Sequence, residues 1–588
     1  MNNYALRTNQ EDGAKGESIF TTLRKLLPLL AQEGPLLAAA LFAVLINSAL
    51  TILVPILVGD AVDKYIVTHQ YHGVLVYCGW LLLTFFGMLG SGYAQTRIMG
   101  AVGQRVLFRL RGSLFNKLQE LPIAFFNQNK AGDLISRINN DTDKLNQLFS
   151  RSLVQFVGNI FIIIGAGIAM VSVNSRLGGA ALIPAAGLIV IIALTTGWVK
   201  RTNFKSLQTL GGLSAEIQES LENFRVIIAF NRRDYFRNRF AEVNEGNYKA
   251  ALVAGVANNT YVPVFGLASN AGTLIVVAYG LSLISTGAFS YGLLVSYLSY
   301  VNRFYDPLRQ MASIWSDLQT ALAGWDRISE ILGMKSDLAV LPAGKKADEK
   351  LAVEFRKVGF SYPGGKQVLS KVSFEMARGK TYALVGPTGG GKTTTASLIA
   401  RLFDPTEGQV WITGHDARTL TPEERAKKVG FILQDPFLFS GTVGENILYG
   451  NSEIAGLSTK ELAELIKKEK LEKLVARFDQ GLDTPVSSTG EGISLGQKQL
   501  IAFMRAVLRH PQVLILDEAT ANVDTVTEQL LEEILTLLPK ETTIVIIAHR
   551  LNTIENADGI FFVNGGSVTL AGSMADAVKM LSSGARKS

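Results

Sequence analysis

A glycine-rich run with phosphate-binding spacing occupies Gly386–Thr393, between a strand-like apolar segment and a helix-like segment. Glycines allow a backbone to turn tightly, so that its N–H groups and the following helix N-terminus can cradle phosphates. Lys392 can then reach the terminal phosphates of a nucleotide, and the Thr393 hydroxyl can bind Mg²⁺. A glycine-rich turn without a ligand is the alternative, which the flanking strand and helix disfavour. The residues predicted to bind the nucleotide here are Gly386, Pro387, Thr388, Gly389, Gly390, Gly391, Lys392, Thr393 and Thr394.

Two adjacent acids follow a second strand-like segment, Val513–Leu516. Asp517 can hold Mg²⁺ through water, and Glu518 can polarise an attacking water as a general base. Two such acids could instead cap the next helix, but the presence of the phosphate loop favours the catalytic role. His549 ends a third apolar segment and is a candidate contact for the γ-phosphate. Together these residues predict nucleotide hydrolysis.

The elements that must position these residues are short apolar strands alternating with helix-like stretches. This alternation predicts an α/β domain with a largely parallel sheet. Before it, residues 334–350 are polar, contain Pro and Gly, and are predicted to form a linker. The P-loop nucleotide-binding domain is therefore predicted to span 351–588.

The first half of the chain is poor in charge. Over all 588 residues only 18% are charged, against about 25% in a typical soluble protein, which disfavours disorder, collagen and an all-soluble nucleic-acid binder. Nearly charge-free runs, each close to the ~20 residues that cross a ~30 Å hydrocarbon core, explain the deficit. Six runs in one half argue against the alternative, buried helices of a soluble protein. An all-α transmembrane domain is predicted at 1–333, with spans at about 36–58, 74–94, 154–173, 177–199, 262–285 and 291–310.

Positive charges are unevenly distributed between these spans. Lys and Arg gather in the connections between spans two and three and between spans four and five, whereas the other connections are short and poor in them. The positive-inside rule then predicts that both basic connections, both termini and the nucleotide-binding domain lie in the cytoplasm, with the protein in the cytoplasmic membrane. The net charge of +7 mostly reflects this topology, and no nucleic-acid partner is predicted. The basic connections keep a helical apolar pattern, so cytoplasmic helix extensions joined by short transverse helices are expected.

Further residues are similar to motifs of the ATP-binding-cassette (ABC) family, in the family's order. Ile493–Gln497, ahead of a helix-like segment, resembles the signature motif. Gln434 is similar to the Q-loop glutamine, and Tyr362 resembles the aromatic residue that stacks on adenine. Ala521–Asp524 resembles the D-loop, which Asp524 ends, and His549 resembles the switch histidine.

The membrane half is similar to an ABC exporter. Phe125–Asn127 and Gly132–Arg137 resemble its first coupling-helix region, and six predicted spans before one cassette match a half-transporter. The resemblance implies ATP-driven export of hydrophobic or amphipathic drugs or lipids by alternating access, with spans four and five reaching across to a partner chain. Its cofactors would be ATP and Mg²⁺, with Mg²⁺ near Thr393, Gln434 and Asp517. ATP is sandwiched between two cassettes in this family, so the signature residues would serve ATP on the partner: Ser494, Leu495, Gly496 and Gln497.

The partner and the substrate stay open at this point. Glu518 and His549 are intact, whereas the signature departs from the family's Leu-Ser-Gly-Gly-Gln at Ile493 and Leu495. This combination favours a heterodimer, whose second half lacks the catalytic glutamate, over a homodimer. A peptide exporter, or an ATP-gated channel or regulator of the same architecture, is the alternative function. Several span residues could line a cavity or serve helix packing: Asn47, Asn159, Asn270, Asn302, Trp80, Phe161, Tyr261, Phe265, Tyr297 and Tyr300.

Overall fold

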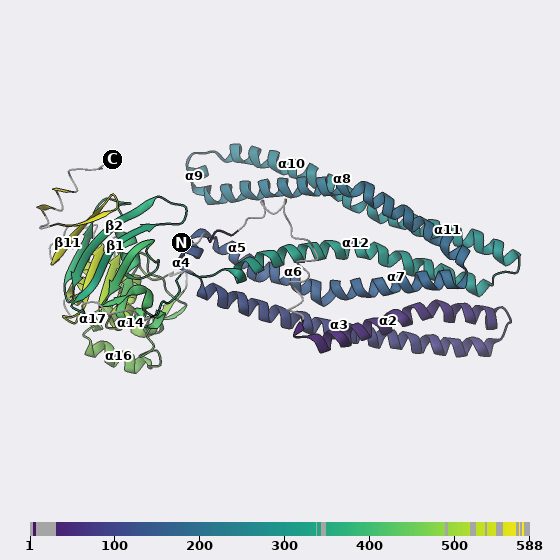
Figure 1. Ribbon diagram of the computed structural model, residues 1–588, viewed down its shortest axis with the longest axis horizontal. Helices are drawn as coiled ribbons and strands as arrows, with labels where there is room; N and C mark the ends of the chain where they lie inside the picture. Colours follow the sequence, from purple (N-terminus) through teal and green to yellow (C-terminus); the bar gives the residue numbers. More distant parts are fainter. Residues whose placement is uncertain are drawn as a thin grey trace. The chain divides into compact units, whose positions relative to one another are not determined.

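The computed structural model (Figure 1) describes residues 4–6, 31–336, 338–342, 349–487, 492–517, 525–535, 538–547, 557–571, 575–576 and 579–580, without the side chains of 312, 525–528 and 532. Three predicted site residues, Glu518, Asp524 and His549, lie outside the described residues. The chain divides into two compact units. One unit comprises 1–6, 119–131 and 334–588, and the other comprises 7–118 and 132–333.

The second unit is a bundle of long helices (Figure 1). Apolar composition without charged interruptions favours helices whose backbone groups are all satisfied internally, as a membrane requires. The main helices are α2 (Gly34–Ala61), α3 (Tyr71–Glu120), α7 (Leu153–Val173), α8 (Ser175–Glu222), α10 (Arg233–Asn259), α11 (Tyr261–Ser285) and α12 (Tyr291–Gly333). The shorter elements are η1 (Val62–Ile66), α5 (Ala131–Ser136), η2 (Arg137–Asp141), α6 (Thr142–Gln147), η3 (Leu148–Ser152) and α9 (Phe224–Ala229).

Five helical segments in the described part of the chain are long and apolar enough to cross a membrane: Gly34–Ile66, Tyr71–Glu120, Ala131–Val173, Ser175–Glu222 and Arg233–Ser285. The sixth predicted span falls in α12, which is not among these five. Its apolar part is short, and Arg303 and Asp306 interrupt it. The prediction of an all-α membrane domain is therefore confirmed, whereas the count of six spans is not, because only five segments of the described residues meet the length and hydropathy of a span.

Helix α12 lies against α2, α7 and α11 and carries three buried tyrosines. The Tyr300 hydroxyl donates to the Ile52 carbonyl on α2 at 2.8 Å, and the Tyr305 hydroxyl to the Ala181 carbonyl on α8 at 2.8 Å. The Tyr297 hydroxyl donates to the Met170 carbonyl on α7. Tyr297 and Tyr300, two candidates for a cavity lining, thus belong to the helix packing. Phe265 is also buried, in the same core.

The four asparagines in the spans fall into two groups. Asn47 donates to the Met88 carbonyl of α3 at 3.0 Å, and buried Asn159 donates to the Gln310 side chain of α12 at 3.4 Å. Both therefore join helices. Asn270 and Asn302 are exposed on the single chain and remain candidates for a substrate path.

Buried ion pairs join η2 to the end of α12. Arg137, 1% exposed, donates to Glu330 at 2.9 Å and to Asp133 at 3.0 Å. The Arg327 Nε donates to Asp141 at 2.8 Å. A side chain at Gly324 would lie 3.3 Å from the Asp141 carbonyl oxygen, so a glycine there permits the close approach of the two elements.

The first unit is built around two main sheets. A four-stranded antiparallel sheet has the order β2-β1-β4-β5, and a six-stranded sheet has the order β12-β11-β3-β10-β9-β6. In the latter, β6, β9, β10, β3 and β11 run parallel and β12 antiparallel. The strands are β1 (Leu351–Ser361), β2 (Gln367–Ala377), β3 (Thr381–Val385), β4 (Glu407–Ile412), β5 (His415–Asp416), β6 (Val429–Ile432), β7 (Gly441–Thr442), β8 (Pro485–Val486), β9 (Val513–Asp517), β10 (Thr543–Ile547), β11 (Gly559–Asn564) and β12 (Ser567–Ala571).

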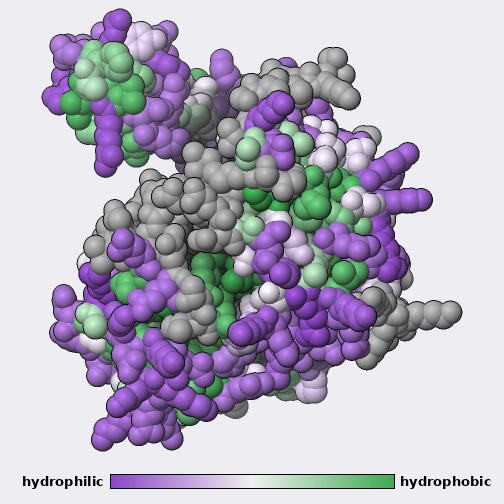
Figure 2. All heavy atoms as spheres, turned by 90° about the vertical axis from the view of Figure 1, so that its left-hand side faces the viewer, coloured by the Kyte–Doolittle hydropathy of each residue, from purple (hydrophilic) through white to green (hydrophobic). Residues whose placement is uncertain are grey.

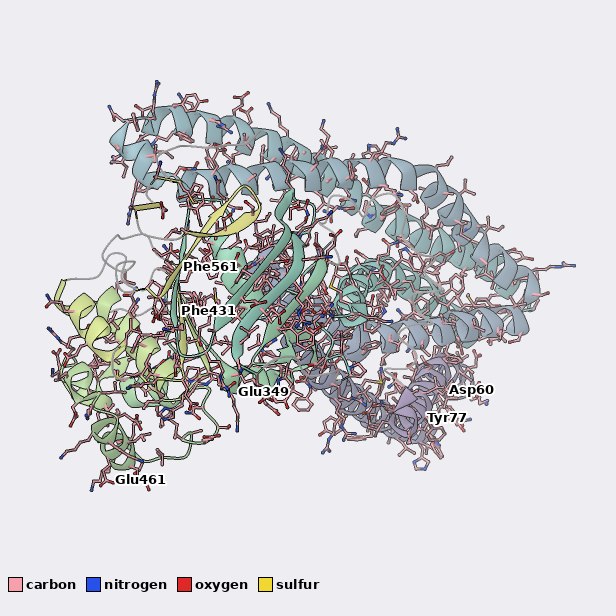
Figure 3. All side chains as sticks on the ribbon, turned by 60° about the vertical axis from the view of Figure 1, so that its left-hand side comes forward. Asp60, Tyr77, Glu349, Phe431, Glu461 and Phe561 are labelled. Carbon is pink, nitrogen blue, oxygen red and sulfur yellow. The ribbon has the colours of Figure 1, made fainter. Side chains whose placement is uncertain are left out.

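Helices complete this unit. They are α4 (Ile123–Gln128), α13 (Lys392–Ile399), α14 (Pro422–Lys428), α15 (Val443–Leu448), α16 (Thr459–Lys468), α17 (Glu472–Val475), α18 (Leu495–Val507) and α19 (Thr525–Leu535), with the 3₁₀ turns η4 (Ala417–Thr419) and η5 (Gly481–Asp483). Of these, α13, α14 and α18 pack against strands of the parallel sheet. Figure 3 labels Phe431 on β6 and Phe561 on β11, with Glu461 on α16 in a separate helical part. Strands β9 and β10 are buried throughout. The predicted α/β fold with a largely parallel sheet is confirmed, and the antiparallel sheet is an addition to it.

Candidate nucleotide site

The phosphate loop connects β3 to α13 and is pressed against β11. A Cβ atom on Gly390 would lie 2.6 Å from the Val563 carbonyl oxygen, a distance that no side chain tolerates. Gly391 has a φ of 109°, in the left-handed region that favours glycine, and stands directly before α13. These two positions bring the loop backbone and the N-terminus of α13 into the arrangement that binds anions.

Lys392 folds back across the loop. Its Nζ donates to the Gly386 carbonyl at 2.9 Å and to the Pro387 carbonyl at 3.1 Å, and the residue is buried. The ammonium is therefore held over the loop. Thr393, the next residue, is exposed, so its hydroxyl is accessible to a ligand.

Tyr362, which directly follows β1, lies beside the phosphate loop. Its hydroxyl is 3.0 Å from the hydroxyl of Thr394, the third residue of α13. The ring packs edge-on against Phe360 and Phe403, with centroids 4.9 Å and 5.3 Å away. The structure thus brings together two residues that are 32 positions apart and that the sequence assigned to the same nucleotide.

The carboxyl ends of the parallel strands share one edge of the sheet. Asp517, 6% exposed, ends β9 opposite Ile547 of β10. Ile432 of β6 pairs with Leu516, so exposed Gln434 follows at the same edge. The hydroxyl, carboxylate and amide oxygens of Thr393, Asp517 and Gln434 are donors that suit Mg²⁺. Glu518 and His549 lie outside the described residues.

The signature residues form the start of α18. The Gln497 N–H donates to the Ser494 hydroxyl at 3.2 Å, and the Ser494 N–H donates to the Gln497 side chain at 2.8 Å. This capping box satisfies two backbone groups of the helix start. Leu495 is the first residue of α18, and Gly496 is buried. The capping role of Gln497 was missed, although its Ser-x-x-Gln spacing is a visible signal.

The phosphate loop and the signature stand on different parts of the unit. Helix α13 packs against β10, β4 and β9, whereas α18 packs against α15 and β6. Strands β3 and β6 are three positions apart in the sheet order, which corresponds to roughly 14 Å at the usual strand spacing. The N-termini of α13 and α18 therefore belong to helices with different neighbours in the unit.

Comparisons with known families give one match in each half of the chain. Residues 37–308 match the family described as ABC transporter transmembrane region, and residues 369–521 match the family described as ABC transporter. The chain is 35% identical over 573 residues to the uncharacterized ABC transporter ATP-binding protein YfiC of Bacillus subtilis, covering 95% of this chain and 92% of that protein. This chain belongs to the ABC transporter family.

Two further ABC relatives carry names that mention a substrate. A fatty acid ABC transporter ATP-binding/permease protein of Mycobacterium tuberculosis is 32% identical, covering 82% of this chain and 76% of that protein. A probable multidrug resistance ABC transporter ATP-binding/permease protein, YheH of Bacillus subtilis, is 30% identical, covering 85% of this chain and 73% of that protein. The prediction of an ABC exporter half-transporter, a multi-pass membrane protein with a transport-coupled ATPase, is confirmed.

One residue of the ABC signature helix was not foreseen. Arg505 of α18 donates to the Asn446 carbonyl at 2.8 Å and to the Phe437 carbonyl at 3.2 Å. Its guanidinium lies 5.3 Å from the Tyr449 ring centre, and burial lowers its pKa. Arg505 thus ties the signature helix to the segment that follows Gln434. A single arginine within the apolar run of α18 was the available signal.

Proposed function

We propose that this chain is one half of a dimeric exporter that uses ATP hydrolysis to move hydrophobic or amphipathic molecules, drugs or lipids, out across the cytoplasmic membrane. The separation of the phosphate loop from the signature helix carries the dimer proposal. A signature helix from a second chain can therefore contact the ATP that is bound at the N-terminus of α13. The named relatives support the substrate class, since their names mention fatty acids and multidrug resistance.

Each site residue is proposed to have its own role in ATP hydrolysis. The backbone of Gly386–Thr394 and the Lys392 ammonium bind the phosphates, while Tyr362 turns its ring to the adenine. Glu518 accepts a proton from the water that attacks the γ-phosphorus, the bond from that phosphorus to the β–γ bridging oxygen breaks, and ADP and phosphate leave. His549 orients the γ-phosphate, and Asp524 contacts the partner cassette. Thr393, Gln434 and Asp517 would hold Mg²⁺, which neutralises charge on the phosphates.

The signature of each chain is proposed to serve the partner's ATP. Ser494, Leu495, Gly496 and Gln497 start a helix of thirteen residues, whose N-terminal N–H groups and dipole favour an anion. The alternating-access cycle follows from ATP binding more tightly to the closed pair than to the open one. Hydrolysis removes that preference and reopens the pair.

An exposed apolar surface supports a partner chain. The short helix α9 connects α8 to α10, and Phe224 and Phe230 at its two ends are 54% and 74% exposed. Figure 2 shows hydrophobic side chains gathered at this tip and ringed by hydrophilic ones. A cluster of exposed apolar side chains outside the spans is typical of an interaction site. The intact catalytic set together with Leu495 in the signature favours a heterodimer.

The catalytic assignment is tested with Glu518→Gln. Loss of the general base should lower ATP turnover by about a hundredfold or more, while ATP binding is retained because the phosphate loop is unchanged. Glu464→Gln, at an exposed position of α16, is the matched control and should turn over ATP normally. Near-normal turnover by Glu518→Gln would overturn the assignment of the base. Robust cooperative turnover by the purified single chain would overturn the heterodimer.

A further inference from the structure

We infer that Tyr4–Leu6, close to the start of the chain, acts as a clamp that holds helix α4 to the segment just beyond α12. Tyr4 is thereby a positioning residue for coupling between ATP turnover and transport. The coupling role rests on the proposed export function, whereas the clamp itself does not.

Two of the three side chains in this segment are buried. Tyr4 is 2% exposed and Leu6 9% exposed, whereas Ala5 between them is exposed. This alternation is that of an extended backbone, which turns every second side chain to the same side. Tyr4 and Leu6 therefore share an inward face.

Side chains at the end of α4 bind the backbone of the segment. The Tyr4 N–H donates to the Gln128 side-chain oxygen at 3.0 Å. The Asn129 side chain donates to the Tyr4 carbonyl at 2.9 Å and accepts from the Leu6 N–H at 2.9 Å. The same amide donates to the Phe125 carbonyl at 2.7 Å, so it closes the end of α4 as well. One asparagine thus joins the end of the helix to the clamp.

The Tyr4 side chain contacts both α4 and the segment just beyond α12. Its ring lies edge-on to Phe125 of α4, with centroids 6.5 Å apart, and Phe125 is fully buried. Its hydroxyl donates to the Lys335 carbonyl at 3.1 Å. Lys335 is two residues beyond the end of α12 at Gly333. A single residue therefore connects the helix that follows α3 with the segment that follows α12.

This connection has a mechanical consequence. Helix α4 continues from α3, and Lys335 continues from α12, so the two are reached through different long helices. With the clamp in place, α4 and the segment at Lys335 move as one body. Without it, α4 can shift separately, so ATP turnover continues while fewer molecules are transported per ATP.

The clamp is tested by hydrogen-exchange mass spectrometry and by transport of a lipophilic fluorescent dye, with the full chain and any second half reconstituted in liposomes. Tyr4→Ala removes the ring and the hydroxyl, and we expect faster exchange in 123–128 with no change in α16. We expect the number of dye molecules moved per ATP to fall about fivefold while ATP turnover is retained. Tyr4→Phe keeps the ring contact, so the exchange rate in 123–128 should stay near the wild-type rate. The number of dye molecules moved per ATP should fall by less than for Tyr4→Ala.

Ala5→Ser is the matched control, because this exposed neighbour should leave both measurements at wild-type values. Unchanged exchange in 123–128 for Tyr4→Ala would overturn the clamp. Faster exchange in 123–128 with an unchanged number of dye molecules moved per ATP would overturn the positioning role of Tyr4. If the wild type moves no dye or lipid analogue with ATP, the export proposal fails, and the exchange measurement still decides on the clamp.

Discussion

The nucleotide unit and the membrane unit use polar side chains in opposite ways. At the sheet edge, Thr393 and Gln434 are exposed to solvent, from which a ligand would approach. In the helical bundle, Tyr300 and Tyr305 are buried and donate to carbonyls of neighbouring helices. In the first unit water satisfies a polar group until a ligand replaces it, whereas hydrocarbon offers no partner. A polar residue in a span is therefore first a candidate for packing, and only an exposed one is a candidate for substrate.

The largest effect is expected in the phosphate loop. Gly390→Val would drive a side chain into the Val563 carbonyl oxygen and displace the loop. Loss of two charge-assisted hydrogen bonds to phosphate should weaken ATP binding by about a hundredfold or more, as measured with a fluorescent nucleotide. Gly456→Val is the control, since a Cβ there meets nothing within 4 Å. Equal affinity for the two variants would contradict the packing of this loop on β11.

In the membrane unit the largest effect is expected at the buried ion pairs. Arg137→Gln removes a buried guanidinium from Glu330, whose side chain is 24% exposed. The loss should therefore stay below the roughly 3–5 kcal/mol of a fully buried pair and reach about 2 kcal/mol. Arg237→Gln is the matched control on α10, where the side chains of Arg237 and Asp234 are 78% and 91% exposed. It should cost at most about 0.5 kcal/mol. Denaturation in detergent measures both, and a smaller loss for Arg137→Gln than for Arg237→Gln would contradict the account.

A more moderate effect separates packing from substrate contact. Tyr305→Phe loses one buried hydrogen bond, to Ala181, and should lower the unfolding free energy by about 1 kcal/mol without altering which dyes are transported. Asn302→Ala, at an exposed position of the same helix, should leave stability unchanged and alter dye preference. The reverse pattern would contradict the division drawn between the two groups of polar residues.

The smallest effect is a pH dependence near the start of β3. The Lys380 ammonium, 2.8 Å away, and the Thr381 N–H lower the pKa of Asp558. A lowered pKa means that this stabilisation is present above the unfolded value of about 3.9 and is lost as the pH falls through the folded value. Asp558→Asn should thus destabilise by about 0.5 kcal/mol at pH 7. The difference in unfolding free energy between Asp558→Asn and wild type should vanish in acid, and a difference that grows below pH 4 would contradict this.

Much of the nucleotide site could be predicted because its chemistry is local in sequence. A strand, a glycine loop and a helix encode the phosphate site within the continuous segment 381–399, and Asp517 ends its own strand. The contacts of Arg505 were missed because they depend on which elements pack against α18, whereas the capping role of Gln497 was missed although Ser494 and Gln497 are only three positions apart. The antiparallel sheet was missed although β1–β2 and β4–β5 pair between consecutive strands; only the β1–β4 pair joins distant segments.

The membrane unit was predictable in outline only. Apolar runs identified the helices, but the partners of Tyr297, Asn47 and Asn159 lie on other helices and have no local signal. The clamp also joins residues that are far apart in the sequence. Tyr4 meets Gln128, 124 positions away, and Lys335, 331 positions away.

The central claim is that ATP hydrolysis at this chain's phosphate site drives transport across the membrane. The most direct measurement is ATP-dependent uptake of a lipophilic dye and of a fluorescent lipid analogue into inverted membrane vesicles containing wild type or Glu518→Gln, with any second half co-expressed. The account predicts uptake of at least one probe with wild type and ATP, and none above background with the variant. Equal ATP-dependent uptake with both proteins would contradict it.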